Sequence, residues 1–597
     1  MPRFSTLRAL ALPLALALAA GCSPPEETHG ATGEAGGEPE ARAVPPLQTD
    51  TAGLRWVEET LASLTLRQRV AQLVFPWISG QPQGQNAAEW QRMQQWAQDG
   101  VGGLIVSTGT PAALAAKLNA AQARAGVPLL IVSDLETGPG MRLRPGGTDM
   151  PPSMAFGAAR DAELAREAGR VTAVEARAVG IHMTLGPLFD VNNNPANPII
   201  NVRSFGADPE LVGLMGTAWM EGARERGLLS AGKHFPGHGD TRVDSHVGLA
   251  RVTSDSAQFF AGEIPPFARA VRGGMDGMLV GHLATEAVDG PDAPPASLSP
   301  RVVGGVLRGR LGFEGLAITD ALNMGGVTRH YSVAEASILA LLAGADVLLQ
   351  PPGHPQVIDR IVAAVESGRI PPARIEEAVR RVLLAKASAG VHRGARVDPQ
   401  GFQVVVGAEA HTAVARRVAE RSITLARDRG DLVPLPPGAR ILHVTYTATG
   451  RAPGGGTLQS ALAAGGGAVE HGRVGPATPA STFAQLRQRA AAVDVVIASV
   501  VIAPFQYRAL GMEGGFGPWV ESLSSAGRPV VAVSLGSPYL LDGFPSVPAY
   551  LLAWSSGAAS ERAAARALLG TAPIGGRLPV ALPPHHRLGE GIDRAAR

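Results

Sequence analysis

Eight short apolar segments alternate with helix-like segments between Val57 and about Gly390, and this alternation constrains the fold more than any other feature of the chain. Helical periodicity separates the apolar segments, for example over residues 333–343. Eight strand–helix repeats predict a parallel (β/α)8 TIM-like barrel, with an open doubly wound sheet as the alternative. The predicted strands are residues 71–75, 103–106, 129–134, 181–186, 228–234, 277–282, 315–320 and 345–350.

A second α/β segment follows the predicted last barrel helix over residues 370–389, and a chain of 597 residues is long enough for two cores. Alternating strands and helices in this part predict a three-layer α/β/α sandwich. Its predicted strands are residues 440–446, 493–501, 529–534 and 549–554. We therefore expect the domains as a barrel at 53–395, a linker at 396–420 and a C-terminal sandwich at 421–597.

The N-terminus has the pattern of an export signal. Arg3 and Arg8 precede an Ala/Leu/Pro run over residues 9–20, which is too short to span a bilayer. The only cysteine, Cys22, follows directly, so no disulfide within the chain is possible. Its position resembles the lipidation site of bacterial lipoproteins, although Ala19 stands where that pattern prefers leucine. Simple signal cleavage without lipidation is the alternative.

Residues 1–22 are accordingly expected to be a lipoprotein signal peptide. Residues 23–52 are rich in Pro, Glu, Gly and Ala and predict a disordered tether. A lipid on Cys22 would make the protein an exported, membrane-anchored lipoprotein that faces the periplasm or the cell exterior.

Charge argues against a nucleic-acid partner, because the formal net charge is only +2 and no basic stripe is present. Lysine occurs only at Lys117, Lys233 and Lys386 in a chain otherwise rich in arginine. Each lysine is therefore a candidate for a role that the planar fork of arginine does not fill.

Chemically able side chains recur where the predicted strands end. Asp134, Lys233 with His234, His282 and Asp320 all occupy such positions. The carboxyl ends of the strands form the active-site rim of a (β/α)8 barrel. This recurrence predicts a catalytic site there.

Histidine and aspartate are frequent in the segment 233–241 and in Asp244-Ser245-His246, which follows it closely. His234 and His238 have the spacing of helical zinc ligands, but the intervening proline and glycines oppose a helix. We therefore predict a glycine-rich loop and neither a metal nor a cofactor.

Asp244 and His246 form a plausible dyad, in which a carboxylate orients an imidazole that donates and accepts protons near neutral pH. Hydrogen bonds that merely pin the loop are the alternative. Asp320 closes an apolar strand, where a carboxylate is costly unless it is used or paired, for example with Arg142 or Arg203.

These residues carry a resemblance. Lys-His-Phe-Pro-Gly-His-Gly-Asp-Thr at 233–241, followed by Asp-Ser-His, resembles glycoside hydrolase family 3, in its β-N-acetylhexosaminidase (N-acetylglucosaminidase) branch. The likeness extends through the segment 190–200, Arg203-Ser-Phe-Gly and the segment 318–324. It covers nearly all of the mature chain.

The resemblance implies a retaining exo-β-N-acetylglucosaminidase, which releases terminal N-acetylglucosamine from cell-wall fragments or chitooligosaccharides through a covalent glycosyl-aspartate. It implies Asp320 as nucleophile and His246 as acid/base, tuned by Asp244. The residues that it implies as sugar ligands are Asp134, Arg142, Arg203, Lys233 and His234. The family pattern Asp-Gln-Glu-Gly-Gly is here Asp-Leu-Glu-Thr-Gly, starting at Asp134, which puts the fine subsite preference in question.

Three alternatives stay open. A family 3 β-glucosidase or xylosidase would take its acid/base from a glutamate of the second domain, for which Glu513 is the candidate. A cell-wall-binding lipoprotein would have kept the fold and lost the chemistry. Phosphate in place of water as the acceptor would make the enzyme a phosphorylase.

Overall fold

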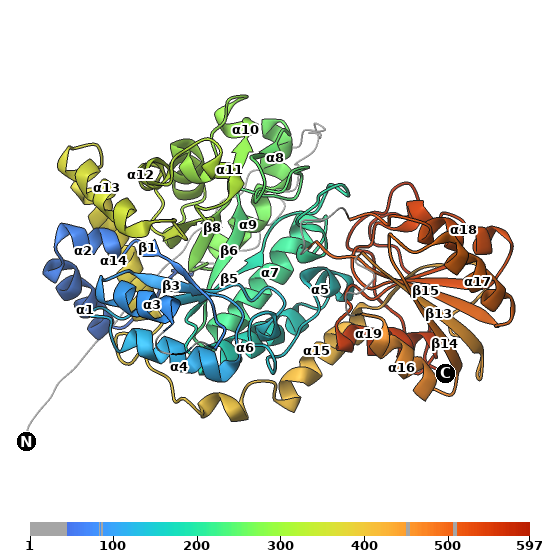
Figure 1. The fold of residues 1–597 in the computed structure, drawn as a ribbon. Coiled ribbons are helices and arrows are strands. Elements are labelled where there is room, and N and C mark those ends of the chain that lie inside the picture. Colours follow the sequence, from blue (N-terminus) through green and yellow to red (C-terminus); the bar gives the residue numbers. More distant parts are fainter. Residues whose placement is uncertain (1–43, 83, 85–86, 449–453, 505–509) are drawn as a thin grey trace, which may run out of the picture. The chain divides into compact units, whose positions relative to one another are not determined.

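The computed structural model describes residues 44–82, 84, 87–448, 454–504 and 510–597 (Figure 1). The predicted signal peptide, Cys22 and most of the predicted tether lie outside the described residues. Residues from Ala43 to Arg597 form one compact unit, which contains a barrel followed by a sheet domain.

Eight strand positions close into a parallel ring, as predicted. Seven strands pair in the order β2, β3, β4, β5, β6, β8, β10. The pair β1–β11 completes the ring, because Val347 bridges to Ile318 of β10 and only Pro76 separates β1 from β2. The strands are β1 (Val74–Phe75), β2 (Trp77–Ile78), β3 (Gly103–Val106), β4 (Leu130–Ser133), β5 (Met183–Leu188), β6 (Leu229–Phe235), β8 (Gly277–Val280), β10 (Leu316–Thr319) and β11 (Leu348–Leu349).

Each of the eight predicted segments overlaps one of these strands, and the strand residues are buried almost throughout. Burial from both sides explains why the segments are continuously apolar and do not alternate. A short parallel pair outside the ring, β7 (Ala250–Val252) with β9 (Leu283–Thr285), was not predicted.

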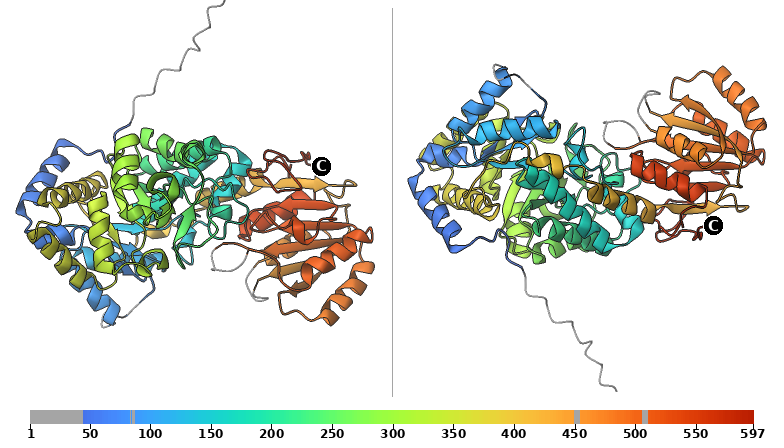
Figure 2. Two further views of the ribbon diagram at one scale, coloured as in Figure 1. Left: turned by 90° about the horizontal axis from the view of Figure 1, so that it is seen from above. Right: turned by 90° about the horizontal axis from the view of Figure 1, so that it is seen from below.

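Helices surround the barrel strands (Figures 1 and 2). Their starts follow local capping rules: Asp161 caps the helix α6, and Ser332 caps α12, which ends at a left-handed Gly344. The main helices are α1 (Thr51–Ser63), α2 (Leu66–Ala71), α3 (Ala88–Gln98), α4 (Pro111–Gln122), α5 (Ser153–Ala159), α6 (Ala162–Ala178), α7 (Pro209–Arg224), α8 (Ser256–Gly262), α9 (Ile264–Arg272), a π-helix (Arg301–Arg310), α11 (Gly325–Thr328), α12 (Val333–Ala343), α13 (His354–Glu366) and α14 (Pro372–Ser388).

The stretch predicted as a linker contains most of the helix α15 (Glu409–Ser422). His411 on this helix contacts the buried Glu175 of α6, with its Nδ1 2.8 Å from Oε1. The stretch is therefore partly helical and packed against the barrel.

The second domain is a three-layer α/β/α sandwich with the strand order β12, β17, β16, β15, β13, β14. Only β12 runs antiparallel to its neighbour. One face packs against α15, α16 and α19, and the other against α17 and α18. The bounds are β12 (Thr424–Asp428), β13 (Arg440–Thr447), α16 (Gly456–Ala464), β14 (Ala468–Val474), α17 (Ala480–Ala491), β15 (Val495–Val501), α18 (Phe516–Ser525), β16 (Val530–Ser534), β17 (Ala549–Leu552) and α19 (Ala558–Leu568).

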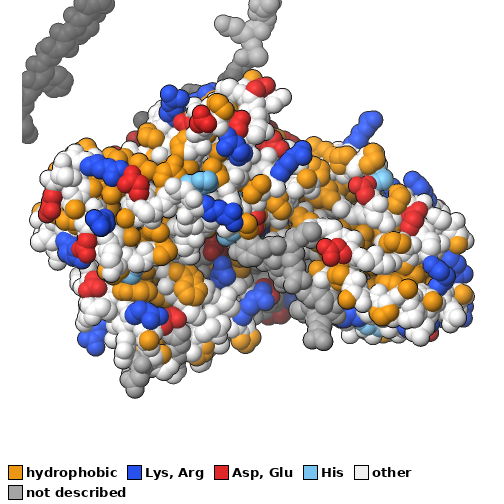
Figure 3. Space-filling view, turned by 45° about the horizontal axis from the view of Figure 1, so that its top comes forward, with side chains coloured by type: hydrophobic (Ala, Val, Ile, Leu, Met, Phe, Trp, Pro, Cys, Tyr) orange, Lys and Arg blue, Asp and Glu red, His pale blue; other side chains and the backbone are white. Residues whose placement is uncertain are grey.

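The face drawn in Figure 3 shows cationic and anionic side chains interspersed among neutral and apolar ones. Lys117, Lys233 and Lys386 are all buried, so the surface cations of the described residues are arginines. Among the helices of the described residues, none has the length and apolar character that crossing a membrane requires.

Candidate active site

A cavity of about 550 Å³ opens at the carboxyl ends of the barrel strands. Asp134 directly follows β4, Lys233 and His234 end β6, and Asp320 directly follows β10. Parallel strands bring these ends to one rim, which explains why residues far apart in the chain meet. The predicted site residues that line the cavity are Asp134, Arg142, Arg203, Lys233, His234, His246 and Asp320.

A network of alternating charges forms one wall of the cavity. Lys233 Nζ lies 2.9 Å from Asp134 Oδ1 and 2.6 Å from Glu136 Oε1. Arg142 donates to the other oxygen of Asp134 at 3.0 Å. Arg203 donates two parallel hydrogen bonds to Glu136, each 2.9 Å long. Such bidentate pairs fix both partners in one geometry.

The charges in this wall are mutually stabilised. Burial raises the pKa of Asp134, but Lys233 and Arg142 outweigh burial and hold that pKa below its ordinary value. Arg203 and Lys233 likewise overcome burial and hold the pKa of Glu136 well below its ordinary value. The wall therefore presents ammonium and guanidinium donors beside carboxylate acceptors, a combination suited to sugar hydroxyls.

Glu136 lines the cavity but was absent from the predicted set of site residues. Its side chain is only 4% exposed, so it is a buried anion that needs its two cationic partners. The sequence offered a signal, because Glu136 is the glutamate of the Asp-Leu-Glu-Thr-Gly segment.

A second network anchors the loop that follows β6. Asp190 accepts from the backbone N–H groups of His234 (3.1 Å) and His238 (2.8 Å), and its other oxygen lies 2.8 Å from His234 Nδ1. The ring of His238 contacts Thr241 Oγ1 at 2.6 Å and Ser245 Oγ at 3.1 Å. Asp190 and His238 thus position both ends of the loop, a role that sequence reasoning missed.

Close packing explains a glycine in this loop. A Cβ atom at Gly239 would lie 1.6 Å from the carbonyl oxygen of Val191. Only glycine allows this approach, which brings the loop against the segment after β5.

The predicted dyad is present. His246 Nδ1 lies 2.8 Å from Asp244 Oδ1, which also accepts from the backbone N–H of His246 at 2.9 Å. Burial lowers the pKa of His246, but the bond to Asp244 and the negative charges of Asp320 and Asp244 raise it above the ordinary value overall. A histidine in this setting holds a proton near neutral pH and can donate it.

Asp320 lies on the cavity side of β10. Burial raises its pKa, whereas His282, His234 and His246 lower it, and the net shift is downward. The backbone N–H of Ala321 donates to Asp320 Oδ1 at 2.8 Å. Arg142 pairs with Asp134 and Arg203 with Glu136, and in the described part of the chain neither arginine forms the ion pair considered for Asp320. Asp320 is therefore an ionised carboxylate at the cavity, as a nucleophile requires.

The second domain reaches the cavity through Pro504, which lies after β15. Glu513 is exposed and does not belong to the described lining. Its backbone N–H donates to the Tyr446 hydroxyl oxygen at 2.9 Å. The described geometry thus gives no support to Glu513 as an acid/base.

Within the described part of the chain, no group of three or more His, Cys, Asp or Glu side chains has the arrangement of a metal site. The two ring nitrogens of His238 both contact hydroxyl groups, and His234 Nδ1 contacts Asp190. The histidine pair with zinc-like spacing is therefore used in hydrogen bonds that shape the loop.

Comparison with known proteins finds relatives of this chain and a similar solved structure. Beta-N-acetylglucosaminidase/beta-glucosidase of Cellulomonas fimi is 33% identical over 399 residues, which are 65% of this chain and 69% of that protein. Beta-hexosaminidase of Thiobacillus denitrificans is 36% identical over 283 residues, or 46% of this chain and 77% of that protein. The solved family 3 beta-N-acetylglucosaminidase of Paenibacillus sp. str. FPU-7 is 33% identical with a TM-score of 0.78, covering 87% of this chain and 99% of that one.

Two domain matches cover most of the described chain. Residues 65–385 match the glycosyl hydrolase family 3 N-terminal domain, and residues 356–590 match the family 3 C-terminal domain. The two matches follow the order of the barrel and the sandwich, and the chain belongs to glycosyl hydrolase family 3.

Proposed function

We propose that this glycoside hydrolase is a retaining exo-β-N-acetylglucosaminidase, acting on N-acetylglucosamine-terminated cell-wall fragments or chitooligosaccharides. The observation that carries the proposal is one cavity lined by both the ionised Asp320 and His246, whose ring is oriented by Asp244. The names of the relatives from Cellulomonas fimi and Thiobacillus denitrificans support the choice of sugar.

The proposed reaction has two steps. The Asp320 carboxylate attacks the anomeric carbon as the glycosidic bond breaks, and His246 donates its proton to the leaving oxygen. His246 then takes a proton from water, whose oxygen attacks the anomeric carbon and releases Asp320 with overall retention. A histidine at this position places no second anion beside Asp320, which a carboxyl acid/base would do.

The charged wall takes the role of the sugar site in this proposal. Lys233, Arg142 and Arg203 would donate to hydroxyl or carbonyl oxygens of the bound sugar, and Asp134 would accept from a hydroxyl. His234, oriented by Asp190, would complete the site. Their mutual hydrogen bonds hold these groups in place before the sugar arrives, which reduces the entropy lost on binding.

Export and anchoring form part of the proposal. The pattern up to Cys22 supports a lipid-anchored protein outside the cytoplasm, where wall-derived fragments are accessible. Metabolic labelling with a radioactive fatty acid, in wild type and a Cys22→Ala variant, tests it; equal labelling of the two would contradict lipidation at Cys22.

The reaction is tested with p-nitrophenyl N-acetyl-β-glucosaminide and the matching glucoside, on the wild type and an Asp320→Ala variant. We expect turnover of the N-acetyl substrate that the substitution abolishes. Preference for the glucoside would favour a β-glucosidase, and no turnover by folded protein would favour a binding protein.

The acceptor needs its own test, because a solved beta-glucoside phosphorylase is 25% identical with a TM-score of 0.82, covering 90% of this chain and 98% of that one. Products formed with and without inorganic phosphate separate the two reactions. We expect free N-acetylglucosamine under both conditions, whereas a sugar phosphate would show that phosphate is the acceptor.

A further inference from the structure

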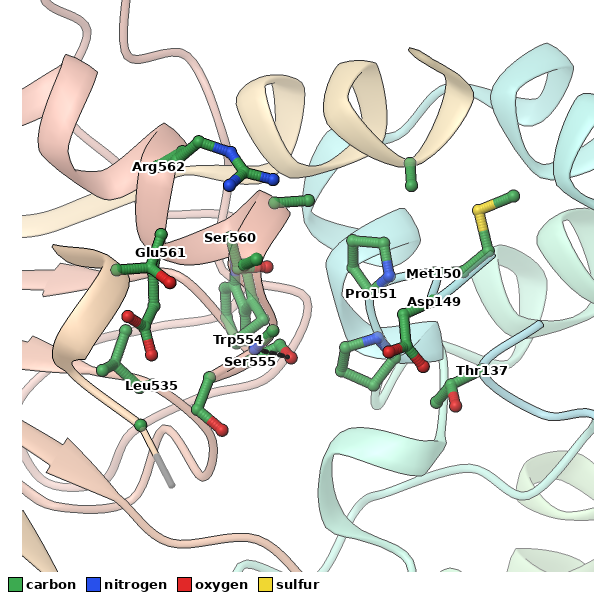
Figure 4. A pocket seen from close by; sticks show the side chains of 18 of the residues that line it. Thr137, Asp149, Met150, Pro151, Leu535, Trp554, Ser555, Ser560, Glu561 and Arg562 are labelled. Atoms are coloured by element: carbon green, nitrogen blue, oxygen red, sulfur yellow. Dashed lines mark hydrogen bonds between the residues drawn. The ribbon is translucent and has the colours of Figure 1, made fainter. Parts of the chain in front are cut away.

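A second cavity, of about 700 Å³, lies at the carboxyl edge of the sandwich sheet and is separate from the proposed catalytic residues (Figure 4). Four parallel strands end at it. Gly454 lies between β13 and α16, and Gly456 is the first residue of α16. Ala503 follows β15, Leu535 follows β16 and Trp554 follows β17. Barrel residues such as Thr137 and Asp149 line the opposite side.

The position of this cavity in the sheet is the one at which α/β sheets bind ligands. From β13 the chain goes to β14 on one side and then to β15 on the other, so the strand order reverses between β13 and β15. Loops on the two sides of such a reversal diverge and leave a crevice at the carboxyl edge.

Two helices, α16 and α19, begin at the cavity, and only the N-terminus of α16 has a carboxylate cap. Glu561 is buried and accepts from the N–H groups of Gly455 (2.7 Å) and Leu458 (2.8 Å), so its carboxylate already caps α16. The eleven-residue helix α19 starts after Gly557, which provides no side-chain cap. The positive end of the α19 dipole therefore remains directed to the cavity.

A polar group without a partner lies in the first turn of α19. Ser560 lines the cavity and is 1% exposed, and within the described residues its hydroxyl has no hydrogen-bond partner. A buried hydroxyl without a partner costs free energy, which a ligand in the cavity would recover. Ser555 and Ser556 add hydroxyl groups to the same wall.

The charges around the cavity favour an anion. Arg144, Arg416 and Arg562 line it, against the carboxylates of Asp149 and Glu561. Asp149 pairs with Arg144 at 2.9 Å, Arg416 pairs with Glu409 outside the lining, and Glu561 is used as the α16 cap. Arg562, on the second turn of α19, is exposed at the cavity without an ion pair among the described residues.

We propose that this cavity binds the oxyanion group of a small molecule, a phosphate or a carboxylate, through the α19 N-terminus, Ser560 and Arg562. The helix N-terminus supplies N–H donors, Ser560 supplies a hydroxyl donor and Arg562 supplies the compensating charge. Thr137 and Val202 of this cavity are the sequence neighbours of Glu136 and Arg203, which line the active-site cavity.

Isothermal titration calorimetry of the full chain tests the proposal, with inorganic phosphate and acetate as separate probes. We expect at least one of them to bind with a dissociation constant of about 1 mM or lower. The stronger binder of the two identifies the anion type. Absence of binding by both probes would overturn the proposal.

Two variants locate the site. Arg562→Gln removes an exposed charge and should raise the dissociation constant about tenfold, as expected for one charge-assisted hydrogen bond. Ser560→Val removes the hydroxyl at similar volume and should also weaken binding. Arg566→Gln, one turn further along α19 and outside the cavity lining, is the charge-matched control and should bind as the wild type does. Unchanged binding in both Arg562→Gln and Ser560→Val would put the ion elsewhere and overturn the proposal.

Discussion

Replacing Lys233 by methionine tests whether the charged wall is an interdependent ion network. The ammonium group lies 2.9 Å from Asp134 and 2.6 Å from Glu136. The side chains of Lys233 and Glu136 are each 4% exposed, so water cannot replace the lost contacts. Methionine fills most of the space but provides no charge.

The expected cost follows from these contacts. Removing one partner of a buried ion pair typically costs about 3–5 kcal/mol. Arg142 still pairs with Asp134 and Arg203 still pairs with Glu136, so neither carboxylate is left alone. We therefore expect a loss near the lower end, about 3 kcal/mol in the free energy of unfolding at neutral pH.

The loss should depend on pH in a defined direction. The pKa values of Asp134 and Glu136 are lowered in the folded protein, so their ionisation stabilises the fold above the unfolded pKa of about 4. That contribution is lost as the pH falls through the folded pKa values. The difference between wild type and Lys233→Met should therefore be full at neutral pH and shrink below about pH 4.

Lys386→Met is the matched control. Lys386 is equally buried, but among the described residues its Nζ hydrogen-bonds only to the Gln72 amide oxygen, at 2.5 Å, and burial lowers its pKa to about 7. Between about pH 7 and 10 the unfolded chain binds more protons at this lysine, so the wild type should gain stability as pH rises. Methionine removes the free-energy cost of burying the lysine ammonium group. We therefore expect Lys386→Met to leave the free energy of unfolding unchanged or to raise it, with the largest gain below about pH 7.

Urea unfolding of the three proteins at about pH 3, pH 7 and pH 9 measures both effects. Equal stability of Lys233→Met and wild type at pH 7 would refute the network. An equal loss in the two methionine variants would show that the effect comes from the lost lysine side chain and not from its carboxylate partners.

Three further substitutions test the site and one buried carboxyl group outside its lining. Asp244→Asn should lower the pKa of His246 and move the basic limb of the kcat/KM profile to lower pH; an unmoved limb would show that His246 is not tuned by Asp244. Glu263 is buried with its pKa raised to about 8, so Glu263→Gln should gain stability over the wild type as pH rises from about 4.5 to 8, which thermal melts would detect; a constant difference would contradict it. Arg203→Lys cannot keep both bonds to Glu136 and should lower kcat/KM about tenfold at unchanged fold; full activity would remove Arg203 from the proposed sugar site.

The barrel could be predicted because its signal is local. Strands buried on both faces are continuously apolar, so each of the eight appeared in the sequence as a short hydrophobic segment. The sandwich strand β14 was missed for the converse reason. It is an edge strand in which every residue except Val474 is exposed or half-buried, and its sequence Ala-Val-Glu-His-Gly-Arg-Val has no apolar run. The antiparallel β12, at the opposite edge, was missed as well.

By itself, the sequence determined the two α/β domains and the reactive residues at the strand ends, since parallel strands bring such residues to one rim. The tertiary structure alone decided which charges pair there. Glu136 meets Arg203 and Lys233 across 67 and 97 residues of chain, and no local pattern encodes a contact of that range. The anion cavity likewise arises from four strand ends and an uncapped helix, which become neighbours only when the sheet forms.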